Sequence, residues 1–246
     1  MKTTAFGLSD VGRRRDTNED GLLLEPELGL FAVADGMGGH AAGEIASRLA
    51  IETIQEVRRG SPAAHLHASA DAAASWLRDA FSEANRRICD SIRVHQERRG
   101  MGTTVVALVQ SGEGAVVGHV GDSRVYLLRG DDLLRLTSDH SWVNEQVKLG
   151  LMSDDAAQRH PMRNIVTRAL GSREEVLVDV AATGLEPGDV FVLCSDGLNT
   201  MLSDAEIHEL VIRHRDDPEA ACRALIQAAN LHGGEDNVTV VVVRFS

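Results

Sequence analysis

The chain has 246 residues, of which 43% are hydrophobic and 25% charged, as in an ordinary globular protein. A chain of this length buries roughly 70–75% of the surface that its unfolded form exposes, so it needs no disulfide or structural metal to hold a core, and we expect one domain over residues 1–246. The net charge of −12 argues against nucleic-acid binding, and an aromatic share of only 3% leaves few platforms for stacked bases.

The cysteines and the chain ends bear on the compartment. Cys89, Cys194 and Cys222 are odd in number and far apart, which fits a reducing compartment without a disulfide framework. The N-terminal MKTTAFGLSD lacks the apolar core of a signal peptide, and the apolar stretch at 238–243 is too short to span a membrane. We therefore expect a cytoplasmic protein with neither a membrane nor a nucleic-acid partner.

Hydrophobic periodicity predicts both strands and helices. In chain order these are strands at 3–9, 21–26 and 29–36, helices at 43–59 and from 68 to about 97, strands at 103–110, 114–122, 124–130 and 133–137, a helix at 141–149, strands at 176–181 and 189–196, helices at 204–214 and 218–232, and a strand at 237–245. The close spacing of the four middle strands predicts antiparallel hairpins. Strand runs with helices inserted in pairs predict an α+β fold of antiparallel sheets covered by helices.

Aspartates recur where the predicted strands begin or end. Asp35, Asp122 and Asp196 follow apolar strand segments, whereas Asp20 and Asp236 directly precede strands. If these strands share an end, the five carboxylates converge on one surface and repel one another unless protons or cations neutralise them. Oxygen ligands without thiolates or clustered imidazoles suit Mg²⁺ or Mn²⁺.

Each aspartate taken alone has a purely structural explanation. Asp-Gly after a strand is a common turn signal, which would account for Asp35 and Asp196, and Asp236 alone fits a turn or a cap. The joint recurrence favours a divalent-metal site. The glycine-rich stretch VADGMGGH at 33–40 is not a nucleotide loop, because no Gly-Lys-Ser/Thr follows and it does not match G-x-G-x-x-G.

Seven short motifs in one order resemble the metal-dependent protein phosphatases (protein phosphatase 2C-like), particularly the bacterial type. They are RxxNED (15–20), DGMGGH (35–40), MGTT (101–104), GDSR (121–124), TSDHS (137–141), SDGL (195–198) and EDN (235–237). The resemblance covers nearly the whole chain. The resemblance implies a central antiparallel β-sandwich flanked by paired helices in αββα layers. It also implies a flap inserted at about 138–170, beside a metal centre at one edge of the sandwich.

The resemblance implies two core ions, Mn²⁺ or Mg²⁺, with a possible third. Asp35 would bridge the two core ions, and the Gly36 carbonyl would be a further ligand. Asp196 and Asp236 would hold the first ion.

The same resemblance gives the remaining ligands. Asp20, with Glu19, would support the second ion, partly through water. Asp122, with Asp196, would contribute to the third and weaker site of the bacterial relatives. Asn237 would orient the carboxylate beside it.

The implied reaction is the attack of a metal-bridging hydroxide on phosphoserine or phosphothreonine, because two ions that share a water lower its pKa. Arg15 would bind two phosphate oxygens with its planar fork. Its spacing to Asn18 and Asp20 favours it over Arg13 and Arg14.

A histidine is the natural proton donor for the leaving alkoxide near neutral pH. Eukaryotic members carry histidine directly after Asp-Gly, where this chain has Met37, so His40 is the candidate general acid and a water is the alternative. We expect His140 and His160 to be structural.

The resemblance predicts a serine/threonine protein phosphatase that acts on phosphorylated proteins and opposes a bacterial Ser/Thr kinase. Because the sequence has no coiled-coil pattern, we expect a monomer. One alternative is a catalytically inactive relative that serves as a binding module. The aspartates at positions 20, 35, 196 and 236 argue against it. The other alternative is a hydrolase of small phosphoesters that uses the same metal centre.

Overall fold

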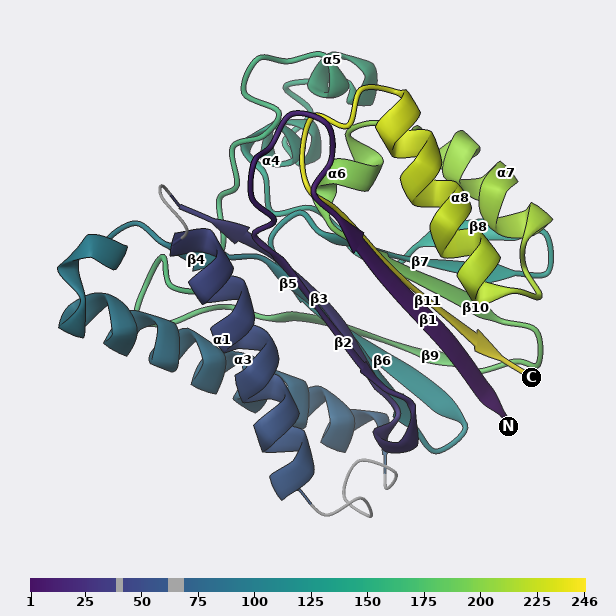
Figure 1. Ribbon diagram of the computed structural model, residues 1–246. Coiled ribbons are helices and arrows are strands. Elements are labelled where there is room, and N and C mark those ends of the chain that lie inside the picture. Colours follow the sequence, from purple (N-terminus) through teal and green to yellow (C-terminus); the bar gives the residue numbers. More distant parts are fainter. Residues whose placement is uncertain (39–41, 62–68) are drawn as a thin grey trace.

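The computed structural model describes residues 1–38, 42–61 and 69–246. Two antiparallel sheets lie face to face, and helices cover both outer faces (Figure 1). The first sheet contains, in spatial order, β1 (Thr3–Asp10), β11 (Val238–Phe245), β10 (Val190–Cys194), β7 (Arg124–Arg129) and β8 (Asp132–Arg135). The second contains β2 (Asp20–Glu25), β3 (Leu30–Met37), β5 (Val105–Ser111), β6 (Gly114–Val120) and β9 (Asp179–Gly184), with β4 (Gly102–Thr103) beside β3. The predicted α+β sandwich with αββα layers is confirmed.

The long helices cover the sheets in pairs. Helices α1 (Ala42–Gly60) and α3 (Ala70–Val94) lie on the second sheet, and α7 (Asp204–Arg213) and α8 (Pro218–Leu231) lie on the first (Figure 1). The short helices are η1 (Pro26–Leu28), η2 (Gln96–Arg98), α4 (Trp142–Lys148), α5 (Asp154–Gln158) and α6 (Asp196–Asn199). No helix in the described part of the chain is long and apolar enough to cross a membrane.

Local capping sequences fix where the long helices begin. The Ser69 hydroxyl accepts a hydrogen bond from a backbone N–H in the first turn of α3. Ser203 and Glu206 form a reciprocal capping box at α7, and Asp217 caps α8 with Pro218 in its first turn. These side chains satisfy amide groups that a helix start leaves without partners, so the helices begin close to the predicted residues.

Three apolar layers hold the four structural layers together. In β11, Val241 and Val243 point between the sheets, whereas Val240 and Val242 point towards α8. Strands buried on both faces read as unbroken apolar runs, which explains the sequence VTVVVV. The layer between the sheets is built from Phe31, Val33, Val106, Leu108, Ala115, Val117, Val125, Leu127, Phe191, Leu193, Val241, Val243 and Phe245.

The hairpin prediction is right for β5–β6 and β7–β8 but wrong for β6–β7. Strand β6 pairs with β5 and β9, whereas β7 pairs with β8 and β10 in the opposite sheet. The chain therefore crosses between the sheets at Gly121. This residue has a φ of +110°, and a Cβ there would lie 2.5 Å from the Cβ of Thr104, so only glycine fits the crossing.

The strand predicted at 176–181 begins three residues later, at Asp179. Val176 and Val178 instead pack against the apolar cluster beneath α3. Their burial against a helix satisfies the apolar pattern that suggested a strand.

The flap, residues 138–170, contains α4 and α5 and returns to its own base. The Trp142 N–H donates to the Ile165 carbonyl at 2.8 Å, and the Thr167 N–H donates to the His140 carbonyl at 2.8 Å. The Trp142 and His160 rings lie 5.1 Å apart, centroid to centroid. The helix predicted at 141–149 is present as α4, with Ser141 as its cap.

The layer between the sheets gives a direct stability prediction. Phe191 is fully buried, and its ring meets Phe245 edge to face at 5.7 Å. We expect Phe191→Ala to lower the free energy of unfolding by about 3–5 kcal/mol, because it removes buried area and leaves a cavity. Urea denaturation measures this. Leu134→Ala is the control, because Leu134 is 50% exposed, and it should change stability by less than about 0.5 kcal/mol. Equal losses in the two variants would contradict the assigned core.

Candidate metal centre

Five aspartates from both sheets meet at one edge of the sandwich. The register of β2 and β3 places Asp20 opposite Asp35. Asp122 lies in the crossing from β6 to β7, Asp196 begins α6 after β10, and Asp236 precedes β11. Burial, followed by charge repulsion from each of the other four, holds the pKa of Asp35 well above its ordinary value. The convergence expected from the sequence is therefore present.

The carboxylates carry more negative charge than their surroundings offset. Burial raises the pKa of Asp20 to about 7, although Ser195 Oγ donates to it at 2.8 Å. Burial and repulsion from Asp236 raise the pKa of Asp196 to about 6, and burial and repulsion from Asp196 raise that of Asp122. Such a cluster needs protons or cations, and its donors are hard oxygens, so these residues fit Mg²⁺ or Mn²⁺.

A cavity of about 550 Å³ opens over these carboxylates. Asp20 is the one predicted ligand that is not part of its wall. The wall contains the other five, Asp35, Gly36, Asp122, Asp196 and Asp236, together with Arg14, Arg15, Glu19, Thr104 and Asn164. The cavity therefore combines carboxylates that can bind cations with two arginines, Arg14 and Arg15, that can bind an anion.

Two glycines allow β3 and α1 to approach each other beside the cluster. A Cβ on Gly36 would lie 2.2 Å from the Gly43 carbonyl oxygen and 2.5 Å from the Glu19 carbonyl oxygen. A Cβ on Gly43 would lie 2.3 Å from the Glu19 carboxylate. Packing therefore leaves no room for a side chain at Gly36 of the DGMGGH motif or at Gly43 of α1. His40 of the same motif lies outside the described residues.

Arg15 reaches the cluster from the loop after β1. Its Nη2 donates to Asp236 Oδ2 at 2.6 Å, and its side chain is 54% exposed. Arg14 lines the same cavity, whereas Arg13 is not part of its wall. Arg15 is therefore the arginine in direct contact with a predicted ligand.

The sequence matches known phosphatases over nearly its whole length. The model of the family described as protein phosphatase 2C matches residues 13–229. The chain belongs to the protein phosphatase 2C family. The serine/threonine phosphatase Stp of Listeria innocua is 39% identical to it over 239 residues, which cover 96% of this chain and 93% of that protein.

Solved phosphatase structures share the fold of this family member. The serine/threonine phosphatase PstP/Ppp of Mycobacterium tuberculosis superposes with a TM-score of 0.90 at 35% identity, over 99% of each chain. The catalytic domain of the phosphatase PstP in complex with two manganese ions superposes with a TM-score of 0.87 at 34% identity, over 98% of this chain and 97% of that chain.

In this phosphatase-family chain, the Asn237 side chain does not bind the Asp236 carboxylate that it was expected to orient. Its Oδ1 accepts from the Glu19 N–H at 2.9 Å, and its Nδ2 donates to the carbonyls of Val11 and Thr17 at 3.0 and 2.9 Å. The neighbouring Asp236 carboxylate receives the backbone N–H of Asn237, at 2.8 Å. The Asn237 side chain therefore holds the loop that carries the arginines, not the adjacent carboxylate.

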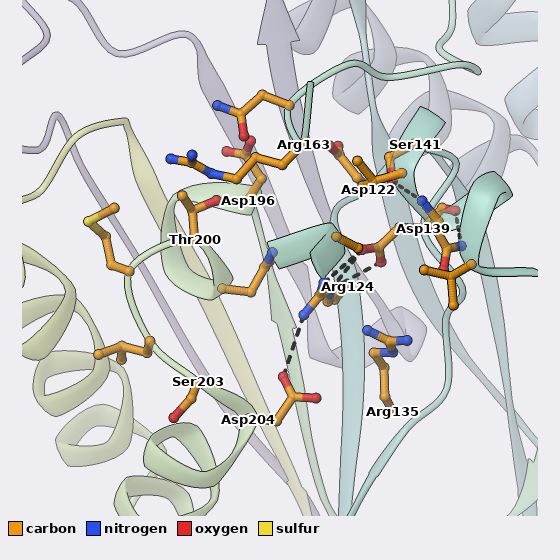
Figure 2. Close-up of a pocket in the computed structure, with 18 of the residues that line it drawn as sticks. Asp122, Arg124, Arg135, Asp139, Ser141, Arg163, Asp196, Thr200, Ser203 and Asp204 are labelled. Atoms are coloured by element: carbon orange, nitrogen blue, oxygen red, sulfur yellow. Dashed lines mark hydrogen bonds and ion pairs between the residues drawn. The ribbon is translucent and has the colours of Figure 1, made fainter. Parts of the chain in front are cut away.

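Several side chains with no role assigned from the sequence hold the cluster in place. Thr104 Oγ1 accepts from the Asp35 N–H at 3.2 Å and shares a hydrogen bond of 2.6 Å with Ser123 Oγ. Arg124 donates to both carboxylate oxygens of Asp139, with the shortest contact at 2.7 Å (Figure 2). All four residues lie within the motifs MGTT, GDSR and TSDHS, so membership of these motifs was the sequence signal that could have identified them.

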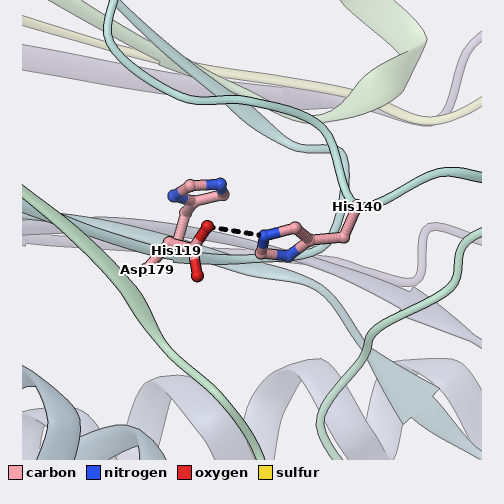
Figure 3. A group of neighbouring side chains, drawn as sticks. All are labelled: His119, His140 and Asp179. Atoms are coloured by element: carbon pink, nitrogen blue, oxygen red, sulfur yellow. Dashed lines mark hydrogen bonds and ion pairs between the residues drawn. The ribbon is translucent and has the colours of Figure 1, made fainter. Parts of the chain in front are cut away.

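His119, His140 and Asp179 form a second group, with potential ligand atoms within 4.8 Å of one another (Figure 3). Their hydrogen bonds argue against a metal. His140 Nδ1 accepts from the Gly121 N–H at 3.0 Å, so the neutral ring carries its proton on Nε2, which faces Asp179 at 3.1 Å. His119 Nε2 contacts the Ser138 carbonyl at 3.0 Å. Burial lowers the pKa of His140 to about 4, which keeps this ring neutral. As expected, His140 is structural: it ties the crossing turn to the flap.

The raised pKa values predict how stability without divalent cations depends on pH. Asp20 and Asp196 have pKa values of about 7 and about 6 in the folded protein, whereas the ordinary pKa of an aspartate is 3.8. The folded state therefore holds more protons between about pH 4 and 7, and these groups lower stability as pH rises through that window. Asp35→Asn removes one carboxyl whose pKa is raised by folding, so we expect its melting temperature in EDTA to fall less steeply with rising pH than that of the wild type.

Mn²⁺ at about pH 7.5 should raise the melting temperature of the wild type by several degrees and that of Asp35→Asn much less. Asp79→Asn, on the exposed side of α3, is the matched control and should behave as the wild type. Equal shifts in the wild type and Asp35→Asn would exclude a metal centre at Asp35.

Proposed function

We propose that residues 1–246 form one catalytic domain that hydrolyses phosphoserine and phosphothreonine in proteins, using two divalent ions at the aspartate cluster. The observation that carries the proposal is the convergence of five aspartates from both sheets beneath one open cavity with Arg15 at its side. The relatives support the reaction class, because Stp and PstP/Ppp are serine/threonine phosphatases. The manganese pair in the PstP catalytic domain supports the choice of ion.

Each ligand has a proposed place. Asp35 would bridge the two core ions, with the Gly36 carbonyl as a further ligand. Asp196 and Asp236 would hold the first ion, and Asp20 with Glu19 the second. Asp122 and Asp196 would form a weaker third site.

When bound, the ions would supply a water of lowered pKa as the nucleophile and offset charge on the phosphoryl oxygens. The chain itself would orient the phosphate. Among the described residues Arg15 donates only to Asp236, and its planar fork suits two phosphate oxygens. His40 remains the proposed donor of a proton to the leaving alkoxide, with a water as the alternative.

The setting of the reaction is also a proposal. A Ser/Thr kinase is the class of enzyme that must produce the phosphorylated substrates. A monomer suffices, because all the proposed ligands come from one chain. The three cysteines carry no disulfide, which fits a reducing cytoplasm.

Phosphate release from a phosphothreonine peptide, with and without Mn²⁺, tests this function. We expect Mn²⁺-dependent turnover, and a loss of about ten- to a hundredfold in kcat/KM for Arg15→Lys, because lysine cannot form the paired contact. Arg13→Lys is the matched control and should stay within about twofold of the wild type.

Three outcomes would contradict the proposal in different ways. No turnover by a folded protein that binds Mn²⁺ would favour the inactive binding module. Rapid hydrolysis of p-nitrophenyl phosphate without peptide turnover would favour a small-phosphoester hydrolase. Equal losses in Arg13→Lys and Arg15→Lys would remove the assigned role of Arg15.

A further inference from the structure

A second cavity of about 430 Å³ lies between the flap and the segment that contains α6 and the start of α7 (Figure 2). It shares Asp122, Asn164 and Asp196 with the cavity over the metal centre. The two cavities therefore meet at the proposed ligands. A peptide whose phosphoresidue reaches the metal centre can extend directly into the second cavity.

The acidic side chains in this second cavity already have partners or assigned roles. Asp139 receives two N–H groups of Arg124, and Asp204 receives the Tyr126 hydroxyl at 2.8 Å and a longer contact from Arg124 at 3.4 Å. Asp122 and Asp196 belong to the proposed metal centre. Asp139 is therefore neutralised by Arg124, and Asp204 is hydrogen-bonded, before any substrate binds.

Two basic side chains of this cavity, in contrast, are available. Arg135 at the end of β8 and Arg159 directly after α5 line the cavity and are exposed, and neither has an ion pair or side-chain hydrogen bond with the side chains that the structure describes. Arg163 of the flap lines it too and forms a long ion pair of 3.8 Å with Glu235. These arginines gather in one cavity of a chain whose net charge is −12.

We propose that this cavity, which we call the arginine groove, binds acidic residues that flank the phosphoresidue in protein substrates. The inference rests on the proposed phosphatase function and adds a substrate preference to it. The guanidinium groups of Arg135 and Arg159 present planar donor pairs that match a carboxylate. Because Arg159 and Arg163 come from the flap and Arg135 from the first sheet, an acidic residue bound between them would contact both walls.

Steady-state kinetics with matched phosphothreonine peptides test the groove. One peptide carries neutral residues on both sides of the phosphothreonine, one carries glutamates before it, and one carries glutamates after it. We expect kcat/KM for one of the acidic peptides to exceed that for the neutral peptide by about five- to tenfold in low salt, and the ratio to shrink as salt is added. In Arg135→Gln/Arg159→Gln this ratio should approach one.

Matched variants separate a specific effect from a loss of net charge. Arg78→Gln/Arg99→Gln removes the same charge from arginines that line neither cavity, and it should keep the wild-type ratio. Arg135→Glu/Arg159→Glu should reverse the preference, towards a peptide with lysines in place of glutamates.

The two proposals fail in distinguishable ways. Absence of turnover with every peptide would overturn the phosphatase function itself. Turnover with a ratio near one in the wild type, or a ratio that the groove variants leave unchanged, would overturn the arginine groove alone.

Discussion

The mutual repulsion of carboxylates at one edge of the sandwich is the constraint on which the rest of the structure depends. Asp20, Asp35, Asp122 and Asp196 all have pKa values raised by burial and by repulsion from neighbouring aspartates. A protein does not gain stability from such a cluster on its own. The arrangement makes physical sense as a binding site whose free energy is completed by divalent cations.

The remainder of the fold keeps these carboxylates together in spite of that repulsion. Asp20 and Asp35 are held opposite each other by the β2–β3 register, and β3 is buried on both faces. Hydrogen bonds from Ser195 and through Thr104 then fix individual groups. Displacing Asp35 would require moving a core strand, so the packing of the sandwich helps to preorganise the metal centre.

Local signals in the sequence predicted many of the strands and helices and the aspartate cluster. Hydrophobic periodicity located the strands and the long helices, and aspartates at strand ends indicated the cluster. The order of the motifs identified the family. Each of these signals is carried by residues close together in the chain.

Features that depend on distant contacts could not be predicted in the same way. The need for glycine at the crossing depends on Thr104, which leaves no room for a Cβ at position 121, and the contacts of Asn237 reach residues more than two hundred positions earlier. The arginine groove is lined by side chains of the flap, of β8 and of the segment from α6 to α7, which are far apart in the sequence. The spacing of residues along the chain carries no information about these long-range contacts.

The most direct test of the central claim is the number of protons released when Mn²⁺ binds. Calorimetric titrations in buffers of different ionisation enthalpy measure this number at about pH 6 and about pH 8.5. Since metal ligands must be deprotonated, carboxyls with raised pKa values should release protons at the lower pH and almost none at the higher. Mn²⁺ binding with no proton release at about pH 6, or no Mn²⁺ binding at either pH, would contradict a metal centre built on mutually repelling aspartates.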